Sequence, residues 1–135
     1  MIDQSGVRFL YPEGLAKATG YTHAVEVRGG RTVYISGQIA LDAQGQLVGA
    51  GDFEAQARQV FGNLVLALAS VGMTFGHVVR LGIYMTDLMH LPTMRRVRDE
   101  FINTAQPPAS TLLQVAGLAL PGLMFEVDAV AAAAE

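Results

Sequence analysis

Two acidic residues near the C-terminal end of the chain, Glu126 and Asp128, have a spacing that suits acid–base chemistry. They lie in the segment MFEVDAV (124–130), whose alternation of side chains is typical of a β-strand. Residues two apart in a strand share one face, which places these carboxylates about 7 Å apart. The carboxylates repel each other, so burial could leave one of them able to exchange a proton near neutral pH. A solvated polar sheet face is the alternative, and spacing alone favours it.

Two arginines, Arg95 and Arg98, lie in a segment that could bind a charged ligand. Projected as a helix at about 100° per residue, residues 91–104 form an apolar stripe that contains Arg98 and has Arg95 at its edge. Such an arginine usually lays its methylene stem on apolar neighbours or pairs across an interface. The functional alternative is a guanidinium that binds a substrate carboxylate. The two interpretations are equally supported for Arg98, whereas packing is favoured for Arg95.

The segment VYISGQIALD (33–42) starts with strand-forming residues and then changes character. A hydroxyl, a bare backbone and an amide follow at Ser36, Gly37 and Gln38, and apolar residues resume at Ile39. Because apolar residues flank these three, we expect them to lie inside the structure rather than at its rim.

Metal and organic cofactors are not expected. The three histidines, His23, His77 and His90, are scattered and have no metal-ligand spacing, and the chain has no cysteine. No glycine-rich phosphate-binding loop opens a predicted helix. Ser70 and Ser110 lack the flanking glycines of a nucleophile elbow.

Composition indicates a single domain over residues 1–135 that associates with copies of itself. The chain is 51% hydrophobic and 16% charged, yet it has no apolar run long enough to span a membrane. The apolar surplus therefore suits a subunit interface. A net charge of −3, with only the short basic run RRVR (95–98), argues against nucleic-acid binding. The absence of cysteine and of a signal-peptide pattern fits a cytoplasmic protein.

Strands and helices are predicted to alternate in the order ββαβαββ. The predicted strands are 22–28, 31–36, 77–87, 109–116 and 123–131, with a further short one near 6–10, and the helices are 52–71 and 91–104. Gly29-Gly30 predicts a tight hairpin between the first two. Right-handed crossovers would place both helices on one face of a mixed sheet, giving an α+β fold whose other face needs a partner subunit.

Six segments occur in an order that resembles the Rid family, the RidA- or YjgF-like proteins, which also carry the older label endoribonuclease L-PSP. The segments are GYTHAV (20–25), VYISGQIALD (33–42), DFEAQARQVFGNL (52–64), YMTDL (84–88), PPASTLLQV (107–115) and PGLMFEVDAVA (121–131). The resemblance implies a chorismate-mutase-like fold of the bacillary type, assembled as a homotrimer with ligand clefts between subunits. Active members hydrolyse enamines and imines such as 2-aminoacrylate to 2-keto acids and ammonia, without a cofactor.

The resemblance also implies roles for individual residues. Tyr21 and Ser36 match residues of the family's cleft, and Glu126 matches the glutamate that positions the attacking water. Gly37 and Gln38 would line the same cleft, with Gly37 allowing a ligand to approach the backbone.

The chain departs from the family at the position that binds the substrate carboxylate. Deaminating members have an arginine where this chain has Ser110; many have cysteine at Leu112, and they usually have asparagine at Arg95. Losing a charge-assisted pair costs on the order of 2–5 kcal/mol. The chain thus resembles an arginine-lacking subgroup, for which we expect poor hydrolysis of 2-iminopropanoate.

Two classes of function follow. The first is a hydrolase or deaminase of a different small metabolite, in which Glu126 positions water and Arg95 or Arg98 supplies the missing cation. The second is a trimeric metabolite-binding or chaperone-like protein without chemistry. Endoribonuclease activity is a weaker third hypothesis, because the acidic chain offers no electrostatic footprint for RNA.

Overall fold

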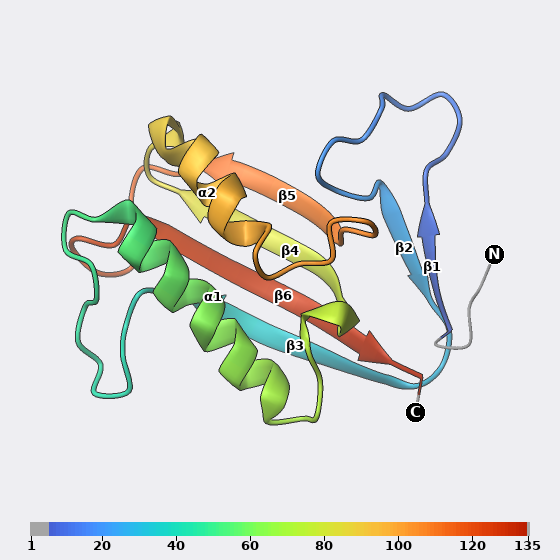
Figure 1. The fold of residues 1–135 in the computed structure, drawn as a ribbon, viewed down its shortest axis with the longest axis horizontal. Helices are drawn as coiled ribbons and strands as arrows, with labels where there is room; N and C mark the ends of the chain where they lie inside the picture. The colour runs from blue at the N-terminus through green and yellow to red at the C-terminus, as the bar shows by residue number, and fades with distance from the viewer. Residues whose placement is uncertain (1–5, 135) are drawn as a thin grey trace.

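The computed structural model describes residues 6–134, and its elements follow the predicted alternation of strands and helices (Figure 1). The strands are Val7–Leu10 (β1), Ala24–Val27 (β2), Arg31–Gln38 (β3), Val78–Met85 (β4), Ala109–Gln114 (β5) and Phe125–Ala133 (β6). The helices are Phe53–Ala69 (α1) and Leu91–Arg98 (α2), with short 3₁₀ turns at Phe75–His77 and Leu88–His90. The additional strand expected near residues 6–10 is present as β1.

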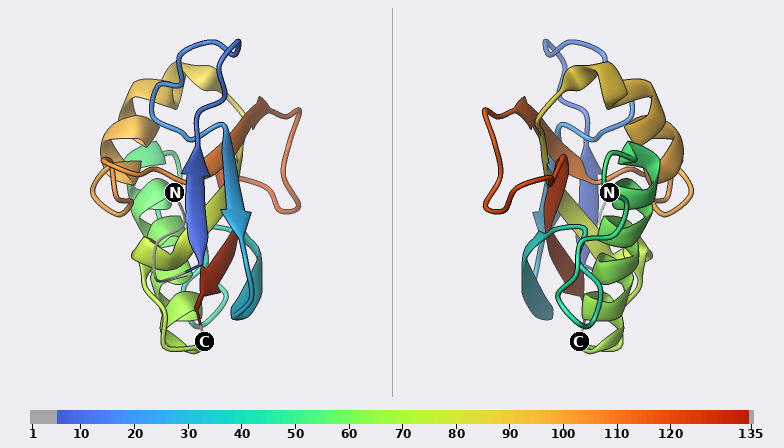
Figure 2. Two further views of the ribbon diagram at one scale, coloured as in Figure 1. Left: turned by 90° about the vertical axis from the view of Figure 1, so that its right-hand side faces the viewer. Right: turned by 90° about the vertical axis from the view of Figure 1, so that its left-hand side faces the viewer.

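Four strands form one mixed sheet in the order β3-β6-β4-β5. β6 runs antiparallel to β3 and β4, whereas β4 and β5 are parallel. Both helices cover the same face of this sheet (Figure 2), which we call the helix face; the opposite one is the open face. The α+β class and the placement of both helices are confirmed.

The core fills the space between the helices and the helix face. α1 begins after Asp52, whose carboxylate accepts a hydrogen bond from the backbone N–H of Ala55 at 3.1 Å and so caps the helix. Alternate residues of β6, from Phe125 to Ala133, point into the core. The helices meet them with the buried residues Phe53, Ala57, Val60, Phe61, Leu64, Leu68, Met94 and Val97.

The hairpin predicted at Gly29-Gly30 is wrong, although both glycines have positive φ angles of 66° and 74°. β2 pairs with β1 in a separate two-stranded sheet, while β3 pairs with β6. A side chain at Gly30 would overlap with the carbonyl oxygen of Ala133. The backbone of β6 thus occupies the place beside β3 that the hairpin prediction assigned to β2.

The second predicted helix is too long. α2 ends at Arg98 rather than near residue 104, because the following turns form shorter-range backbone hydrogen bonds, such as Phe101 N–H to Arg98 C=O at 2.9 Å. Pro92 lies in the first turn of α2, where its missing N–H costs no helical hydrogen bond.

The small sheet of β1 and β2 covers one end of the open face. Val79 packs with Val7 and Ala132 in a second apolar cluster, on the face opposite to that of Leu81. The cause is an irregularity in the β4–β6 register between Val78 and Arg80, which turns Val79 to the other face.

The rest of the open face is uncovered in one protomer. Tyr34, in the middle of β3, is 81% exposed there, and Leu113 of β5 is exposed as well. Within residues 6–134, neither helix has the length and apolar content needed to cross a membrane.

Candidate functional site

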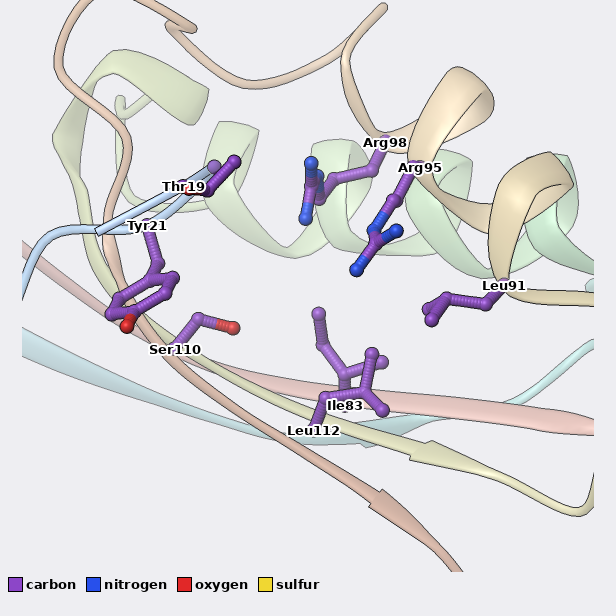
Figure 3. A pocket seen from close by; sticks show the side chains of 9 residues that line it. Thr19, Tyr21, Ile83, Leu91, Arg95, Arg98, Ser110 and Leu112 are labelled. Carbon is purple, nitrogen blue, oxygen red and sulfur yellow. The ribbon is translucent and has the colours of Figure 1, made fainter. Parts of the chain in front are cut away.

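A pocket of about 220 Å³ lies on the helix face, between α2, the start of β5 and the segment before β2 (Figure 3). The parallel register of β4 and β5 brings Ile83 beside Leu112, and these two side chains form the apolar floor. Figure 3 shows Arg95 and Arg98 extending over this floor from α2, with Tyr21 and Ser110 at one side and Leu91 at the other. The pocket is lined by Thr19, Gly20, Tyr21, Ile83, Leu91, Arg95, Arg98, Ser110 and Leu112.

The two pocket arginines differ in what they contact. The Nε–H of Arg98 donates to Oδ1 of Asp99 at 2.9 Å, and the Arg98 side chain is only 12% exposed. Its guanidinium lies against Gly20, where even a β-carbon would be 3.1 Å from Nη2. Arg95 is exposed, and its side chain makes no hydrogen bond or ion pair with any other described residue. Arg95 therefore has a free guanidinium at the pocket, whereas Arg98 has a local counter-charge.

The segment that carries Tyr21 is held in place by the next residue, Thr22, which is 1% exposed. The Thr22 hydroxyl donates to the carbonyl of Pro107, and its backbone N–H donates to the carbonyl of Pro108 at 3.1 Å. Tyr11 adds a hydroxyl–hydroxyl hydrogen bond to Thr22 at 2.8 Å. These contacts fix the Tyr21 side of the pocket to the start of β5.

A second group of predicted site residues lies outside this pocket, on β3 and β6. Ser36, Gly37 and Gln38 belong to β3, whose register against β6 shifts between Ile35 and Gln38 because β3 contains one extra residue there. Ser36 is exposed in the protomer, while Gly37 and Gln38 are half-buried, so the expectation that all three lie inside is wrong for Ser36. Strand alternation after the buried Ile35 places the Ser36 side chain on the open face.

Glu126 is held in a notch that Gly37 creates. A β-carbon on Gly37 would overlap with Oε2 of Glu126 and would lie 2.8 Å from its Cδ. Glu126 is half-buried, and its carboxylate makes no hydrogen bond or ion pair within residues 6–134. Its carboxylate is thus available to a ligand or to a water molecule.

Asp128, the other carboxylate of the pair, is already engaged. It accepts a hydrogen bond from the Tyr84 hydroxyl at 2.9 Å and lies 3.6 Å from a guanidinium nitrogen of Arg80. The hydrogen bond to Asp128, together with burial, raises the pKa of Tyr84 above its ordinary value. Tyr84 and Arg80 therefore hold the Asp128 carboxylate in place, whereas the Glu126 carboxylate has no such partner.

The predicted site residues consequently form two groups on opposite faces of one sheet. Tyr21, Arg95, Arg98, Ser110 and Leu112 line the helix-face pocket, whereas Ser36 and Glu126 lie on the open face. Thr19, Gly20, Ile83 and Leu91 also line the pocket and were not predicted. Leu91 lies one helical turn before Arg95, a spacing that could have indicated it, but Ile83 is revealed only by the β4–β5 register.

The three histidines take structural roles. His23 contacts the carbonyl of Ala16 at 2.6 Å, and the ring of His77 accepts from the backbone N–H of Thr74 at 3.0 Å. His90 stacks on Phe53 with ring centroids 4.7 Å apart. Among the described residues there is no group of three or more side chains that could hold a metal ion.

The chain is similar, in sequence and in structure, to several known proteins. A family model described as endoribonuclease L-PSP matches residues 12–133. Protein DfrA of Myxococcus xanthus is 40% identical over 90% of this chain and 92% of that protein. The 2-iminobutanoate/2-iminopropanoate deaminase of Homo sapiens is 38% identical over 86% of this chain and 85% of the enzyme. The structure of YyfB from Yersinia pestis, a Rid-family protein of unknown function, has a TM-score of 0.86 at 37% identity, covering 94% of this chain and 98% of that one.

Proposed function

The chain belongs to the Rid (YjgF-like, endoribonuclease L-PSP) family, and we propose that it is a cofactor-independent hydrolase of a small imine or enamine carboxylate. The single observation that carries this proposal is the pocket in which a free guanidinium, Arg95, faces Tyr21 and Ser110 across an apolar floor. Such a pocket can hold a carboxylate at one end and an apolar group at the other. The imine deaminases among its relatives support the reaction class.

In the proposed reaction, Glu126 positions and activates a water molecule. The water oxygen bonds to the imine carbon while Glu126 accepts a proton, and the π electrons of the C=N bond move to nitrogen. Glu126 then returns this proton to the nitrogen, which gives a neutral carbinolamine. Glu126 next accepts the hydroxyl proton and passes it to the same nitrogen as the C=O bond forms, the C–N bond breaks and ammonia leaves. The products are ammonia and the 2-keto acid, and every atom comes from the substrate and one water. The availability of the Glu126 carboxylate, in contrast to that of Asp128, supports this role.

We further propose that the site is completed by a second copy of the chain within a homotrimer. Glu126 and Ser110 lie on opposite faces of the sheet, so one protomer does not bring them to the same ligand. A neighbouring protomer would supply Ser36 and Glu126 from its open face to the helix-face pocket, together with Gly37 and Gln38 from the end of β3. The uncovered apolar side chains on the open face, such as Tyr34, support such an assembly.

The test is turnover of 2-imino acids, generated in the assay and followed by ammonia release. We expect Glu126→Gln to lower turnover by about 10² or more, since that is the usual contribution of a general base. Asp128→Asn is the matched control, because it changes the neighbouring carboxylate on the same face, and it should retain most of the activity. Turnover that is unaffected by Glu126→Gln would exclude the proposed mechanism.

The shared site can be tested by mixing inactive variants. Glu126→Gln and Arg95→Gln protomers that are unfolded and refolded together should regain part of the activity, because some clefts then receive both wild-type residues. Each variant refolded alone should stay inactive. Failure to regain activity in mixed oligomers would contradict a site shared between protomers.

The observation that favours a second candidate function is Ser110, which by the sequence resemblance stands at the position where deaminating members of the family have an arginine. If the substrate carboxylate is not held in a reactive position, the same cleft would bind metabolites without hydrolysing them. Tight ligand binding with no turnover of any 2-imino acid would favour that alternative.

A further inference from the structure

Building on the function proposed above, we propose that Arg95, not Arg98, binds the substrate carboxylate, and that the substrate carries one negative charge and a branched apolar side chain. The pocket on the helix face and the contacts of its two arginines indicate which arginine binds the carboxylate and what charge and shape the substrate has (Figure 3).

The choice between the arginines follows from their partners. Arg98 already donates to Asp99 at 2.9 Å and is packed against Gly20, so a ligand carboxylate would have to compete with a covalently adjacent one. Arg95 has no such partner among the described residues, and its guanidinium extends over the pocket in Figure 3. A free guanidinium can offer a carboxylate two parallel N–H donors.

The charge of the ligand follows from the same contacts. Arg95 and Arg98 contribute two positive charges to the pocket, and Asp99 compensates one of them. One net positive charge suits a monocarboxylate, whereas a dicarboxylate would leave its second charge without a partner near the apolar floor.

The shape of the ligand follows from the side chains beneath Arg95. Leu91, Ile83 and Leu112 border the space that its guanidinium covers, and Ile83 is almost fully buried. A carboxylate on Arg95 would place the adjacent side chain of the ligand against these three residues. A branched aliphatic group would bury apolar surface there, and a methyl group would bury much less.

The inference can be tested by calorimetric binding of a stable 2-oxo acid, 4-methyl-2-oxopentanoate, and of its methyl ester. The wild-type protein should bind the acid about tenfold or more tightly than the ester, and should prefer it by a similar factor to pyruvate and to 2-oxoglutarate. Arg95→Gln should weaken binding of the acid about tenfold or more and remove the preference over the ester.

Two matched variants separate the charge contact from general damage to α2. Arg96→Gln removes a cation one residue away that binds Glu54 outside the pocket, and it should leave both affinities unchanged. Arg98→Gln should keep the acid-over-ester preference even where it weakens both ligands.

Several outcomes would overturn the inference. These are a preference for acid over ester that persists in Arg95→Gln, a preference lost only in Arg98→Gln, tighter binding of 2-oxoglutarate, or no binding of the acid by the wild-type protein. Turnover that survives Glu126→Gln would instead contradict the proposed mechanism and leave these binding results standing, so the two failures are distinguishable.

Discussion

Glu126 and Asp128 both lie on the open face of β6, two residues apart, but their carboxylates have different neighbours. These neighbours come from the strands on either side of β6. Tyr84 and Arg80 of β4 engage Asp128, whereas Gly37 of β3 leaves room for Glu126.

The glycine beside Glu126 gives a residue-scale prediction. Gly37→Ala would place a β-carbon on the Glu126 carboxylate, so we expect the carboxylate to rotate out of its notch and turnover to fall. Ammonia release from 2-imino acids measures the effect, and circular dichroism shows whether the variant is folded.

Gly62→Ala is the matched control for that substitution. Gly62 lies in the middle of α1, and a β-carbon there would meet no atom within 4 Å. We expect this variant to keep its activity and to gain roughly 0.5–1 kcal/mol in unfolding free energy, since alanine is the better helix former. Full activity in Gly37→Ala would show that the notch does not position Glu126.

At the scale of elements, local patterns predicted type and order but not partners. The cap at Asp52, the apolar stripe of α1 and the alternation in β4 and β6 each act within one segment, and those elements are present. The pairing of β2 with β1 and of β3 with β6 depends on contacts far apart in the sequence. A double glycine with the correct φ angles therefore predicted a turn correctly and a hairpin wrongly.

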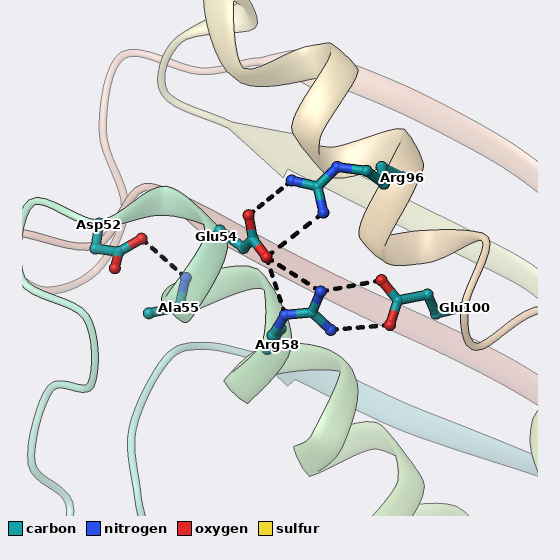
Figure 4. A network of polar contacts seen from close by, with 6 residues as sticks. All are labelled: Asp52, Glu54, Ala55, Arg58, Arg96 and Glu100. Atoms are coloured by element: carbon teal, nitrogen blue, oxygen red, sulfur yellow. Dashed lines mark hydrogen bonds and ion pairs between the residues drawn. The ribbon is translucent and has the colours of Figure 1, made fainter.

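The two helices are joined at their outer surface by a network of four charged residues (Figure 4). Glu54 of α1 binds Arg96 of α2 at 2.6 Å and Arg58 at 3.1 Å. Arg58 also makes two hydrogen bonds to Glu100, each 3.0 Å long. The hydrogen bond from Arg96, followed by that from Arg58, lowers the pKa of Glu54, and Arg58 lowers the pKa of Glu100.

This network predicts a pH-dependent contribution to stability. A carboxyl group whose pKa is lower in the folded than in the unfolded protein stabilises the fold above its unfolded pKa, and this contribution is lost as pH falls through the folded pKa. Glu54→Gln should therefore lower Tm at pH 7, and the difference from wild type should disappear in strong acid. Because these side chains are at the surface, high salt should also reduce the Tm difference between Glu54→Gln and wild type.

The control for Glu54→Gln is Glu13→Gln, which removes an exposed carboxylate that makes no ion pair with another described residue. Its Tm should follow that of the wild type at both pH values. Thermal unfolding monitored by circular dichroism measures all three proteins. A Glu54→Gln difference that stays constant from neutral to acid pH would mean that the ion pairs do not stabilise the α1–α2 contact.

At the scale of the whole molecule, the two groups of candidate site residues lie on opposite faces of the four-stranded sheet. Sequence resemblance identified residues of both groups, yet it carried no information on which face each occupies in this chain. That placement follows from the alternation of side chains in β3, β5 and β6 relative to the buried core, which depends on how these strands pair. The split explains why a monomer would be incomplete, and it makes assembly part of the proposed function.

The final prediction concerns that assembly. If the open face is the interface between copies, Tyr34→Glu places a charge where an exposed aromatic ring now lies, and burying an unpaired charge is costly. We expect wild-type protein to sediment as a trimer and Tyr34→Glu to dissociate to monomers, with loss of imine turnover. Val65→Glu is the matched control, because Val65 is 42% exposed on α1, which covers the helix face, so its trimer and activity should persist. A wild-type protein that is monomeric at micromolar concentration, or a trimeric Tyr34→Glu variant, would contradict an interface on this face.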